Sequence, residues 1–435
     1  MNAWTEYSIE DIVAQQPNAI VDGPFGSNLK TSDYVEQGIP VLQGNNITNN
    51  KFNFSGIRYI TQLKANLLIR SAVKEGDLLT VKIGSVGYSA LIDNLYGNEY
   101  AIIPANLLKA TFNKKLVDSK FVFYLLTFDN GKKALLDLAT NTAQPALSLR
   151  TFKRLTFKYP SLQTQRRISE ILSTIDQTIE KTEALIYKYQ QIKTGLMHDL
   201  FTRGVTADGK LRPPREQAPE IYKETPLGWL PKEWEIIPLG KLADITSGVT
   251  LSSKIYPDQK IEVPYLRVAN VQDGYLDLNE IKTIRVNQAT FENLVLKKGD
   301  VLMNEGGDFD KLGRGTVWQG EIENCIHQNH VFRVRVNNAQ LRSYYLAFWS
   351  ESNFGKKYFV QSSKQSTNLA SINSTQLKAY PVAIPDPIEQ ERIEDRINSI
   401  NFKLITLNKE NAKLYYQKSG LMHDLLTGKV QVSVN

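Results

Sequence analysis

The sequence contains very little cysteine. Cys325 is the only cysteine among the 435 residues, so no disulfide can form within the chain, which fits a reducing compartment. The N-terminus has no basic segment followed by an apolar run, so we expect no signal peptide. No apolar run approaches the ~18 residues that a membrane span requires. These absences predict a cytoplasmic protein that is not inserted in a membrane.

The motifs of a self-sufficient enzyme are also missing. The sequence has no phosphate-binding G-x-x-x-x-G-K-[ST] motif, no Asn-Pro-Pro-Tyr motif of amino-methyltransferases, and none of their glycine-rich cofactor loops. Its glycine-rich segment, Gly306–Gly315, has a different spacing and is expected to be a surface loop. His327 and His330 lie close in sequence, but no carboxylate or cysteine is arranged around them as a metal requires. We therefore predict no catalytic residue and no metal site.

The net charge is modest, and its distribution along the chain is uneven. The chain carries a net charge of +7, and most of the basic excess lies in residues 1–158 and 206–383. A basic excess in these parts is compatible with a nucleic-acid partner. A slightly basic protein without such a partner would explain the charge equally well, so charge alone does not decide.

A long segment occurs twice in the chain. Pro160–Val205 and Pro385–Val430 align without a gap, and both contain the sequence Gly-Leu-Met-His-Asp-Leu, at 195–200 and again at 420–425. Such a long period is not that of a solenoid, whose repeats span roughly 20–50 residues. It indicates a duplicated half-protein, and such a protein usually meets a duplicated target.

Each copy has the apolar spacing of a long helix. Apolar residues alternate at spacings of four and three over about five heptads, which is typical of a coiled coil. We expect the two helices to pair within the chain, although a zipper between two copies of the chain would show the same pattern. The residues predicted to form this seam, or to contact other subunits at the helix ends, are Ile168, Ile175, Ile179, Leu196, His198, Ile393, Ile400, Leu404, Leu421 and His423.

Three residues depart from the helical pattern. Asn411 occupies a seam position, where a polar residue usually fixes the register at the expense of stability. Gly195 and Gly420 lie inside the helices, at ~1 kcal/mol each relative to alanine. Because both copies contain this glycine, we expect another backbone to approach closely there, or the helix to bend.

The segments before the two helices differ from them in character. Short β-branched runs broken by glycine, asparagine and aspartate indicate strands, with helical patterns between them. We read each segment as an α/β or α+β domain, and residues 206–224 as a tether containing several prolines. The predicted boundaries are 1–158 for the first domain, 159–205 for a helix, 206–228 for a linker, 229–383 for the second domain, and 384–430 for a helix.

Polar loops at matching places in the two halves are suited to nucleic acid. Asparagine and glutamine can pair with adenine, arginine with guanine, and lysine or serine in glycine-containing loops can bind phosphates. Taken singly, each loop is more often a solvated turn, but their parallel occurrence favours a shared role. The candidates are Lys30, Asn45, Asn46, Lys82, Ser85, Asn141, Gln144, Arg267, Asn270, Lys311, Arg314, Lys364 and Asn368.

Three motifs together resemble the specificity subunit of type I restriction–modification systems over essentially the full length. They are the segment 22–29 (Asp-Gly-Pro-Phe-Gly-Ser-Asn-Leu), the twin Pro-x-x-x-x-Gln-x-Arg-Ile helix starts, and the twin Gly-Leu-Met-His-Asp-Leu helix ends. Each motif is weak alone, but their order, spacing and duplication are specific. The second half departs from the pattern, because residues 247–250 (Ser-Gly-Val-Thr) replace the Gly-Pro-Phe-Gly signature.

The resemblance implies a fold and a set of partners. It implies two pseudo-symmetric target recognition domains of the α/β (α+β) class, separated by two long antiparallel coiled-coil helices that act as a ruler. Each domain would read one half of a split site in double-stranded DNA. Two methyltransferase subunits using S-adenosylmethionine would dock along the helices, and two restriction subunits using ATP and Mg would complete the enzyme. The chain itself would bind no cofactor.

Two readings from other classes compete with this one. The first is a free-standing restriction–methylation enzyme, which the missing cofactor motifs disfavour. The second is a coiled-coil adaptor without a nucleic-acid role, which would bind specific and random duplexes equally poorly.

Overall fold

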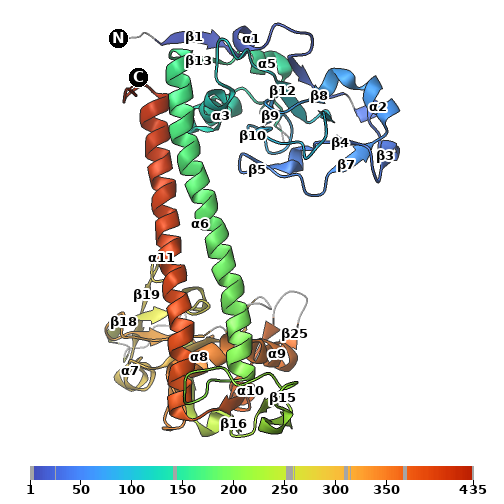
Figure 1. Cartoon of the computed structure of the whole chain (residues 1–435). Coiled ribbons are helices and arrows are strands. Elements are labelled where there is room, and N and C mark those ends of the chain that lie inside the picture. The colour runs from blue at the N-terminus through green and yellow to red at the C-terminus, as the bar shows by residue number, and fades with distance from the viewer. Residues whose placement is uncertain are drawn as a thin grey trace. The chain divides into compact units, whose positions relative to one another are not determined.

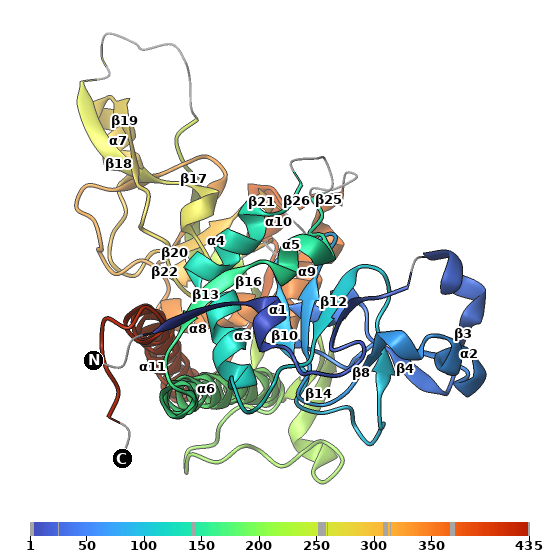
Figure 2. The same cartoon turned by 90° about the horizontal axis from the view of Figure 1, so that it is seen from above.

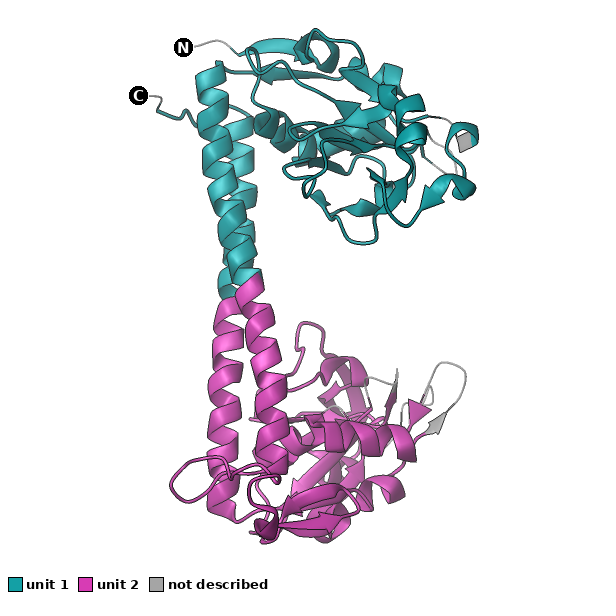
Figure 3. Ribbon diagram, turned by 45° about the vertical axis from the view of Figure 1, so that its right-hand side comes forward, with its two compact units in different colours: residues 1–183, 409–435 teal, residues 184–408 magenta. Residues whose placement is uncertain are grey.

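The computed structural model describes residues 4–24, 26–140, 145–250, 258, 260–307, 312–313, 315–365 and 370–433, with the backbone alone for 26, 307, 364 and 365. Residues 1–183 and 409–435 form one compact unit, and residues 184–408 form the other (Figure 3). The division falls inside two long helices and not at their ends. Each unit therefore contains one globular part and a piece of both helices.

The globular part of the first unit is built on two antiparallel-rich sheets. The four-stranded sheet has the order β10-β9-β12-β2, and the five-stranded sheet has the order β3-β7-β4-β11-β8 (Figures 1 and 2). The first consists of β10 (Ser89–Leu91), β9 (Leu78–Val81), β12 (Leu107–Ala110) and β2 (Ile20–Asp22). The second consists of β3 (Tyr34–Val35), β7 (Arg58–Ile60), β4 (Ile39–Val41), β11 (Ala101–Ile102) and β8 (Ala72–Val73).

Short helices and two strand pairs complete this unit. The helices are α1 (Ile9–Ile12), α2 (Gln62–Leu67), α3 (Ser119–Thr127), α4 (Asp129–Asp137) and α5 (Leu149–Lys153). The pairs are β1 (Thr5–Ser8) with β13 (Thr156–Tyr159), and β5 (Ile47–Thr48) with β6 (Lys51–Phe52). Apolar side chains of α3 and of the four-stranded sheet pack with Ile168 and Leu172 in one core, so this domain is built onto the long helix.

The second unit repeats the order of the four-stranded sheet. It contains β22-β20-β24-β17, a three-stranded sheet β19-β18-β23, and smaller pairings. These strands are β22 (Gly315–Val317), β20 (Val301–Asn304), β24 (Val331–Val336), β17 (Ala243–Ser247), β19 (Lys282–Val286), β18 (Ile261–Leu266) and β23 (Ile326–His327). The smaller pairings involve β16 (Glu235–Pro238) with β27 (Pro381–Ile384), and β21 (Gly306–Gly307) with β26 (Ala370–Ser371) and β25 (Lys364–Gln365).

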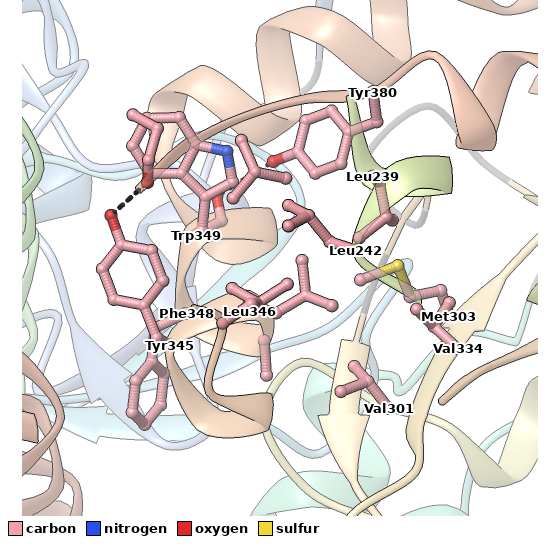
Figure 4. Close-up of a cluster of buried hydrophobic side chains, with 14 of the residues drawn as sticks. Leu239, Leu242, Val301, Met303, Val334, Tyr345, Leu346, Phe348, Trp349 and Tyr380 are labelled. Carbon is pink, nitrogen blue, oxygen red and sulfur yellow. Dashed lines mark hydrogen bonds between the residues drawn. The ribbon is translucent and has the colours of Figure 1, made fainter. Parts of the chain in front are cut away.

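Four short helices cover the second unit, and aromatic side chains fill its core. The helices are α7 (Gln288–Leu294), α8 (Ser343–Glu351), α9 (Asn353–Ser362) and α10 (Ser374–Lys378). Tyr345 and Trp349 of α8 belong to one buried cluster with Tyr380 and the sheet residues Val301 and Met303 (Figure 4). The Tyr345 hydroxyl donates to the carbonyl of residue 383 at 2.8 Å, which satisfies the polar end of a fully buried ring.

The prediction of two long helices is confirmed. α6 spans Leu162–Thr202 and α11 spans Pro387–Leu426. In the first unit, Asp176 pairs with Lys418 at 2.6 Å and Tyr415 donates to Glu183 at 2.6 Å. The numbering rises along one helix as it falls along the other, so the helices are antiparallel and pair within the chain.

The apolar seam also follows the sequence pattern. Ile168, Ile179 and Ile393 are buried, and the other apolar seam candidates are half-buried: Ile175, Leu196, Ile400, Leu404 and Leu421. Residues between these positions are mostly exposed. His198 and His423, by contrast, are exposed, and the ring of His423 lies edge-on to Phe128 with centroids 6.2 Å apart.

The expected close approach at the helix glycines is wrong. Among the described residues, nothing lies within 4 Å of the place a side-chain carbon would occupy at Gly195 or at Gly420. Both positions are exposed on uninterrupted helices. No contact within either unit therefore accounts for the recurrence of this glycine.

The expected tether between the halves is folded. It contains the hairpin β14 (Tyr222–Thr225) and β15 (Gly228–Pro231), and Tyr222 is buried. Arg212 forms a bidentate ion pair with the buried Glu389, in which Nη2 and Oε2 lie 3.0 Å apart. Proline content alone did not reveal this, because the contacts that hold the segment join it to residues distant in sequence, such as Glu389 and Arg392.

None of the helices in the described part of the chain combines the length and the apolar composition needed to cross a bilayer.

Candidate nucleic-acid interface

Two polar turns occupy the same place in the two units. Residues 43–46 follow β4, and residues 267–270 follow β18. The Asn46 side chain accepts from the Gln43 amide at 2.8 Å, and the Asn270 side chain accepts from the Arg267 amide at 2.9 Å. Both asparagines also donate to backbone carbonyls and are buried. Their structural role is to hold the turn, and base contact by them stays a prediction.

The residues beside these asparagines are more accessible. Asn45 is exposed at the tip of the first turn. Arg267 is half-buried, donates to the carbonyl of Glu280 at 3.1 Å and lies 3.3 Å from the carboxylate of the same residue, while its buried Nε has no partner among the described residues. The first turn thus presents an amide and the second a guanidinium, two groups that recognise different bases.

The first glycine of segment 22–29, which we call the signature loop, has a counterpart in the second unit although the rest of the motif differs there. A side-chain carbon at Gly23 would overlap the carbonyl oxygen of Pro104, and one at Gly248 would overlap that of His327. Glycine is needed at both places because a neighbouring backbone occupies the space of a side chain. The motif that differs between the halves is therefore still anchored alike at its first glycine.

The ends of β9 and β20 carry different charged pairs. Lys82 Nζ lies 2.9 Å from Asp22 Oδ2, and Arg70 Nη2 lies 3.6 Å from the other oxygen of that carboxylate. In the second unit, Glu305 occupies the matching place and lies 2.6 Å from His330 Nδ1. Lys82 is therefore committed to a carboxylate in this structure, whereas Ser85 is exposed in the turn that follows.

Buried carboxylates brace both four-stranded sheets. Asp77 accepts from the Lys74 amide at 2.9 Å, and Asp300 accepts from the Lys297 amide at 2.7 Å. Asp300 also holds Arg335 at 2.7 Å through both oxygens. Lys109 lies near Asp77, and burial lowers the pKa of its ammonium group.

The remaining candidates are Lys30, Lys364 and five residues outside the described part of the chain. Lys30 is exposed, and its amide donates to Asp33 at 2.7 Å. Lys364 lies on β25, where only the backbone is described. The other predicted residues lie outside the described part of the chain: Asn141, Gln144, Lys311, Arg314 and Asn368.

The glutamine that recurs at the start of both long helices makes the same hydrogen bonds in each unit. Gln165 accepts from the Asp118 amide at 3.0 Å and donates to the Pro160 carbonyl at 2.9 Å. Gln390 accepts from the Arg342 amide at 2.9 Å and donates to the Pro385 carbonyl at 2.9 Å. Asp118 and Arg342 are the residues that cap α3 and α8. Each glutamine therefore ties a globular part to its long helix in the same way.

The histidines do not form a metal centre. Within the described ranges, no three His, Cys, Asp or Glu side chains are grouped as a metal ion requires. His327 is buried, its Nδ1 lies 2.7 Å from the Val331 carbonyl, and burial lowers its pKa to about 4. His330 faces Glu305 instead of His327.

The chain matches known proteins over most of its length. It matches the family described as type I restriction modification DNA specificity domain over residues 1–188 and 231–414. It is 24% identical over 366 residues to the MjaVIII specificity subunit of Methanocaldococcus jannaschii, covering 83% of this chain and 80% of that protein. It is 21% identical over 395 residues to the EcoKI specificity subunit of Escherichia coli, covering 88% and 79%.

Solved structures show the same fold. The S subunit of the type I restriction–modification system from M. genitalium matches with a TM-score of 0.57 at 16% identity, over 97% of this chain and 96% of that one. A chain from work on complex assembly and conformational transition of the type I R-M system matches with a TM-score of 0.54 at 15% identity, covering 98% of both. The chain belongs to the family of type I restriction–modification specificity subunits.

Proposed function

We propose that this chain recognises a split site in double-stranded DNA, with each unit reading one half. One observation carries the proposal: Gln165 and Gln390 anchor two globular parts identically, while the accessible residues on those parts differ. A duplicated framework with different surfaces suits two different half-sites. The target is then bipartite and asymmetric, because Asn45 and Arg267 favour different bases.

The chain is non-catalytic in this proposal. Two methyltransferase subunits bind along α6 and α11 and supply S-adenosylmethionine, and they methylate adenine at the bound site. Two restriction subunits supply ATP- and Mg-dependent translocation and cleavage. The chain holds none of these cofactors, and we expect the complex in the cytoplasm. Turnover by a preparation proven free of partner subunits would instead favour the free-standing enzyme.

The decisive experiment is to co-express the chain with its methyltransferase and to map methylated adenines across a genome. We expect one bipartite motif with a fixed gap. Exchanging residues 1–158 for a related domain should change one half of the motif only. A change in both halves would contradict independent reading, and equal binding of specific and random duplexes would favour the adaptor.

The helices set the gap in this proposal. Inserting four residues after Lys181 adds ~6 Å of helical rise and leaves the helix only ~40° out of phase. Since each base pair advances ~3.4 Å along a strand, we expect the gap to lengthen by about one or two base pairs. Both half-site sequences should stay the same. An active variant with an unchanged gap would show that the helices are not the ruler.

A further inference from the structure

The helix α2 carries an unusual exposed apolar surface. Leu63 and Leu67 are each 76% exposed, and Ile69, just after the helix, is 55% exposed. Leu63 and Leu67 are four residues apart, so they lie on one face of the helix. The opposite face is anchored, because Ala65 and Leu68 are buried in the core beneath the five-stranded sheet. The three exposed side chains form what we call the α2 patch.

The matching helix of the second unit lacks this surface. α2 and α7 both begin after a capping side chain, Thr61 and Asn287, and both precede the strand next to the edge of their four-stranded sheet, β9 and β20, although the short strand β8 intervenes after α2. Leu68 and Leu294 are buried at the same position of the two helices. The positions of Leu63 and Leu67 are filled in α7 by Ala289 and Asn293, which are also exposed. The apolar character is therefore not required by the shared fold.

Basic side chains surround the α2 patch. Lys64 lies on α2 itself and pairs with Asp33 at 3.0 Å, next to the exposed Lys30. Arg70 adjoins Ile69, and 64% of its side chain is exposed although it pairs with Asp22. Arg58, on β7, lies over the ring of Tyr34 at 5.2 Å. Among the described residues, Lys64 and Arg70 each pair with one carboxylate and Lys30 and Arg58 with none, so positive charge is in excess here and favours a negatively charged partner.

The α2 patch is continuous with the signature loop. Asp22 begins that loop and Asp33 lies four residues after its end, so Arg70, just after α2, and Lys64 on α2 connect this region to both sides of the loop. Leu29 of the loop packs in the same small core as Leu68. Both views place α2 beside β3 at the outer end of this unit (Figures 1 and 2). α2 and the signature loop therefore belong to one surface.

We propose that the α2 patch enters a groove of the half-site bound by the first unit. Leu63 and Leu67 pack against sugars and base edges there, while Lys30, Arg58 and Arg70 bind the flanking phosphates. Apolar side chains are used in this way by proteins that press into a groove. The inference rests on the proposed DNA-binding function and adds a contact that only one half-site receives.

The test replaces the exposed leucines by the residues of the matching helix. The variant L63A/L67N, in complex with the methyltransferase, should bind the specific duplex about tenfold more weakly, since two leucines lose their buried area. The dependence of affinity on salt should stay the same, because no phosphate contact is removed. The conservative variant L63M/L67M should retain the parent affinity, and the melting temperature should not change in either case.

Matched controls make the outcome decisive. L136A removes another exposed leucine of the first unit, on α4, and N293A alters the matching position of α7; neither should change affinity. Unchanged affinity of L63A/L67N, or an equal loss in L136A, would overturn the proposal. The proposal would also be overturned if L63A/L67N no longer assembled with a protein partner but kept the parent affinity for DNA. If the parent complex itself shows no sequence preference, the proposed function fails instead.

Discussion

The two units share their internal contacts and differ in their accessible ones. Gln165 and Gln390 make the same hydrogen bonds, and Asn46 and Asn270 close the same turn. All four side chains are buried. Where side chains reach the surface, the agreement ends: Lys82 pairs with a carboxylate, whereas Glu305 at the matching place pairs with a histidine.

This difference shows how a duplicated chain can acquire two specificities. A buried amide that closes a turn cannot be replaced without leaving backbone groups unpaired, which costs about 1–3 kcal/mol. Exposed positions have no such constraint, since surface substitutions usually change stability by less than about 0.5 kcal/mol. The framework is therefore held constant by its hydrogen bonds, and the surface is free to diverge. The predictions below test both the buried contacts that the two units share and the buried positions at which they differ.

The largest effect is expected at Glu389. Its carboxylate receives Arg212, the Trp234 indole at 3.2 Å and the amide of Val205 at 2.7 Å, all within the second unit. E389A would remove the buried partner of the Arg212 guanidinium and leave only the exposed Glu233, 3.3 Å away, so we expect a loss of about 3 kcal/mol or more in unfolding free energy. Urea unfolding followed by tryptophan fluorescence measures this, because Trp229, Trp234, Trp318 and Trp349 all lie in that unit.

The matching position of the first helix provides the control. It is Thr164, whose hydroxyl lies 2.9 Å from that of Ser161 near the surface. T164A should cost about 0.5 kcal/mol or less. Similar losses in E389A and T164A would show that the folded segment after α6 does not depend on this ion pair.

The second prediction concerns pH and the buried His327. The first unit has Ile103 at the matching place. Burial, helped by nearby Arg333 and Arg335, lowers the pKa of His327 to about 4, although the hydrogen bond to the Val331 carbonyl and the charge of Asp300 act in the opposite direction. The folded state therefore favours the neutral form of the His327 imidazole. Its contribution to stability is therefore complete above the unfolded pKa of about 6.5 and is lost as the pH falls toward 4, in total by about 3 kcal/mol.

The variant H327I gives the second unit the residue of the first. The difference in unfolding free energy between parent and variant should shift in favour of the variant as the pH falls from about 7 to 4.5. Tryptophan fluorescence in urea at several pH values measures this difference. A difference that does not vary with pH would mean that His327 accepts a proton without a penalty.

The sequence alone predicted the elements that depend on periodicity and repetition. Seam residues such as Ile168 and Ile393 were recognised because their spacing is regular over many turns. The twin glutamines were noticed for the same reason. Their partners were not, because the hydrogen bonds from Gln165 join residues 47 apart in the chain. No local pattern contains such a contact.

The candidate site was less predictable. Asn46 and Asn270 were proposed to contact bases, and the structure shows them buried in turns. A sequence shows that a residue is polar but not whether its own backbone uses that polarity. The α2 patch was overlooked for the opposite reason, because leucines in a helix normally indicate a core. Gly195 and Gly420 were expected to mark a close backbone approach or a bend, and neither unit contains the close approach among its described residues.

The third prediction is that the glutamine anchors are equivalent. Q165A and Q390A would each leave a capping amide and backbone carbonyls without partners in a buried place. We expect each to lose about 2 kcal/mol of local stability. Hydrogen exchange should show faster exchange at the start of α3 in the first variant and at the start of α8 in the second. If only one of the two variants exchanged faster, the two glutamines would not be equivalent anchors.

The smallest effect is expected at Asn411, and it has the opposite sign. Asn411 occupies the seam position that Ile186 fills in the first copy, and its Oδ1 has no hydrogen-bond partner among the described residues. A buried carbonyl without a partner lowers stability, and isoleucine would replace it with apolar contact. We therefore expect N411I to raise the unfolding free energy of the helix pair by about 1 kcal/mol. Helical circular dichroism during urea unfolding measures this change, with I186V as a control that should slightly lower stability. If N411I destabilises the pair instead, the asparagine has a partner that the folded chain alone does not provide. If N411I stabilises the pair but the methylated sites then show more than one gap length, Asn411 maintains a single register at the expense of stability, as polar seam residues do in coiled coils.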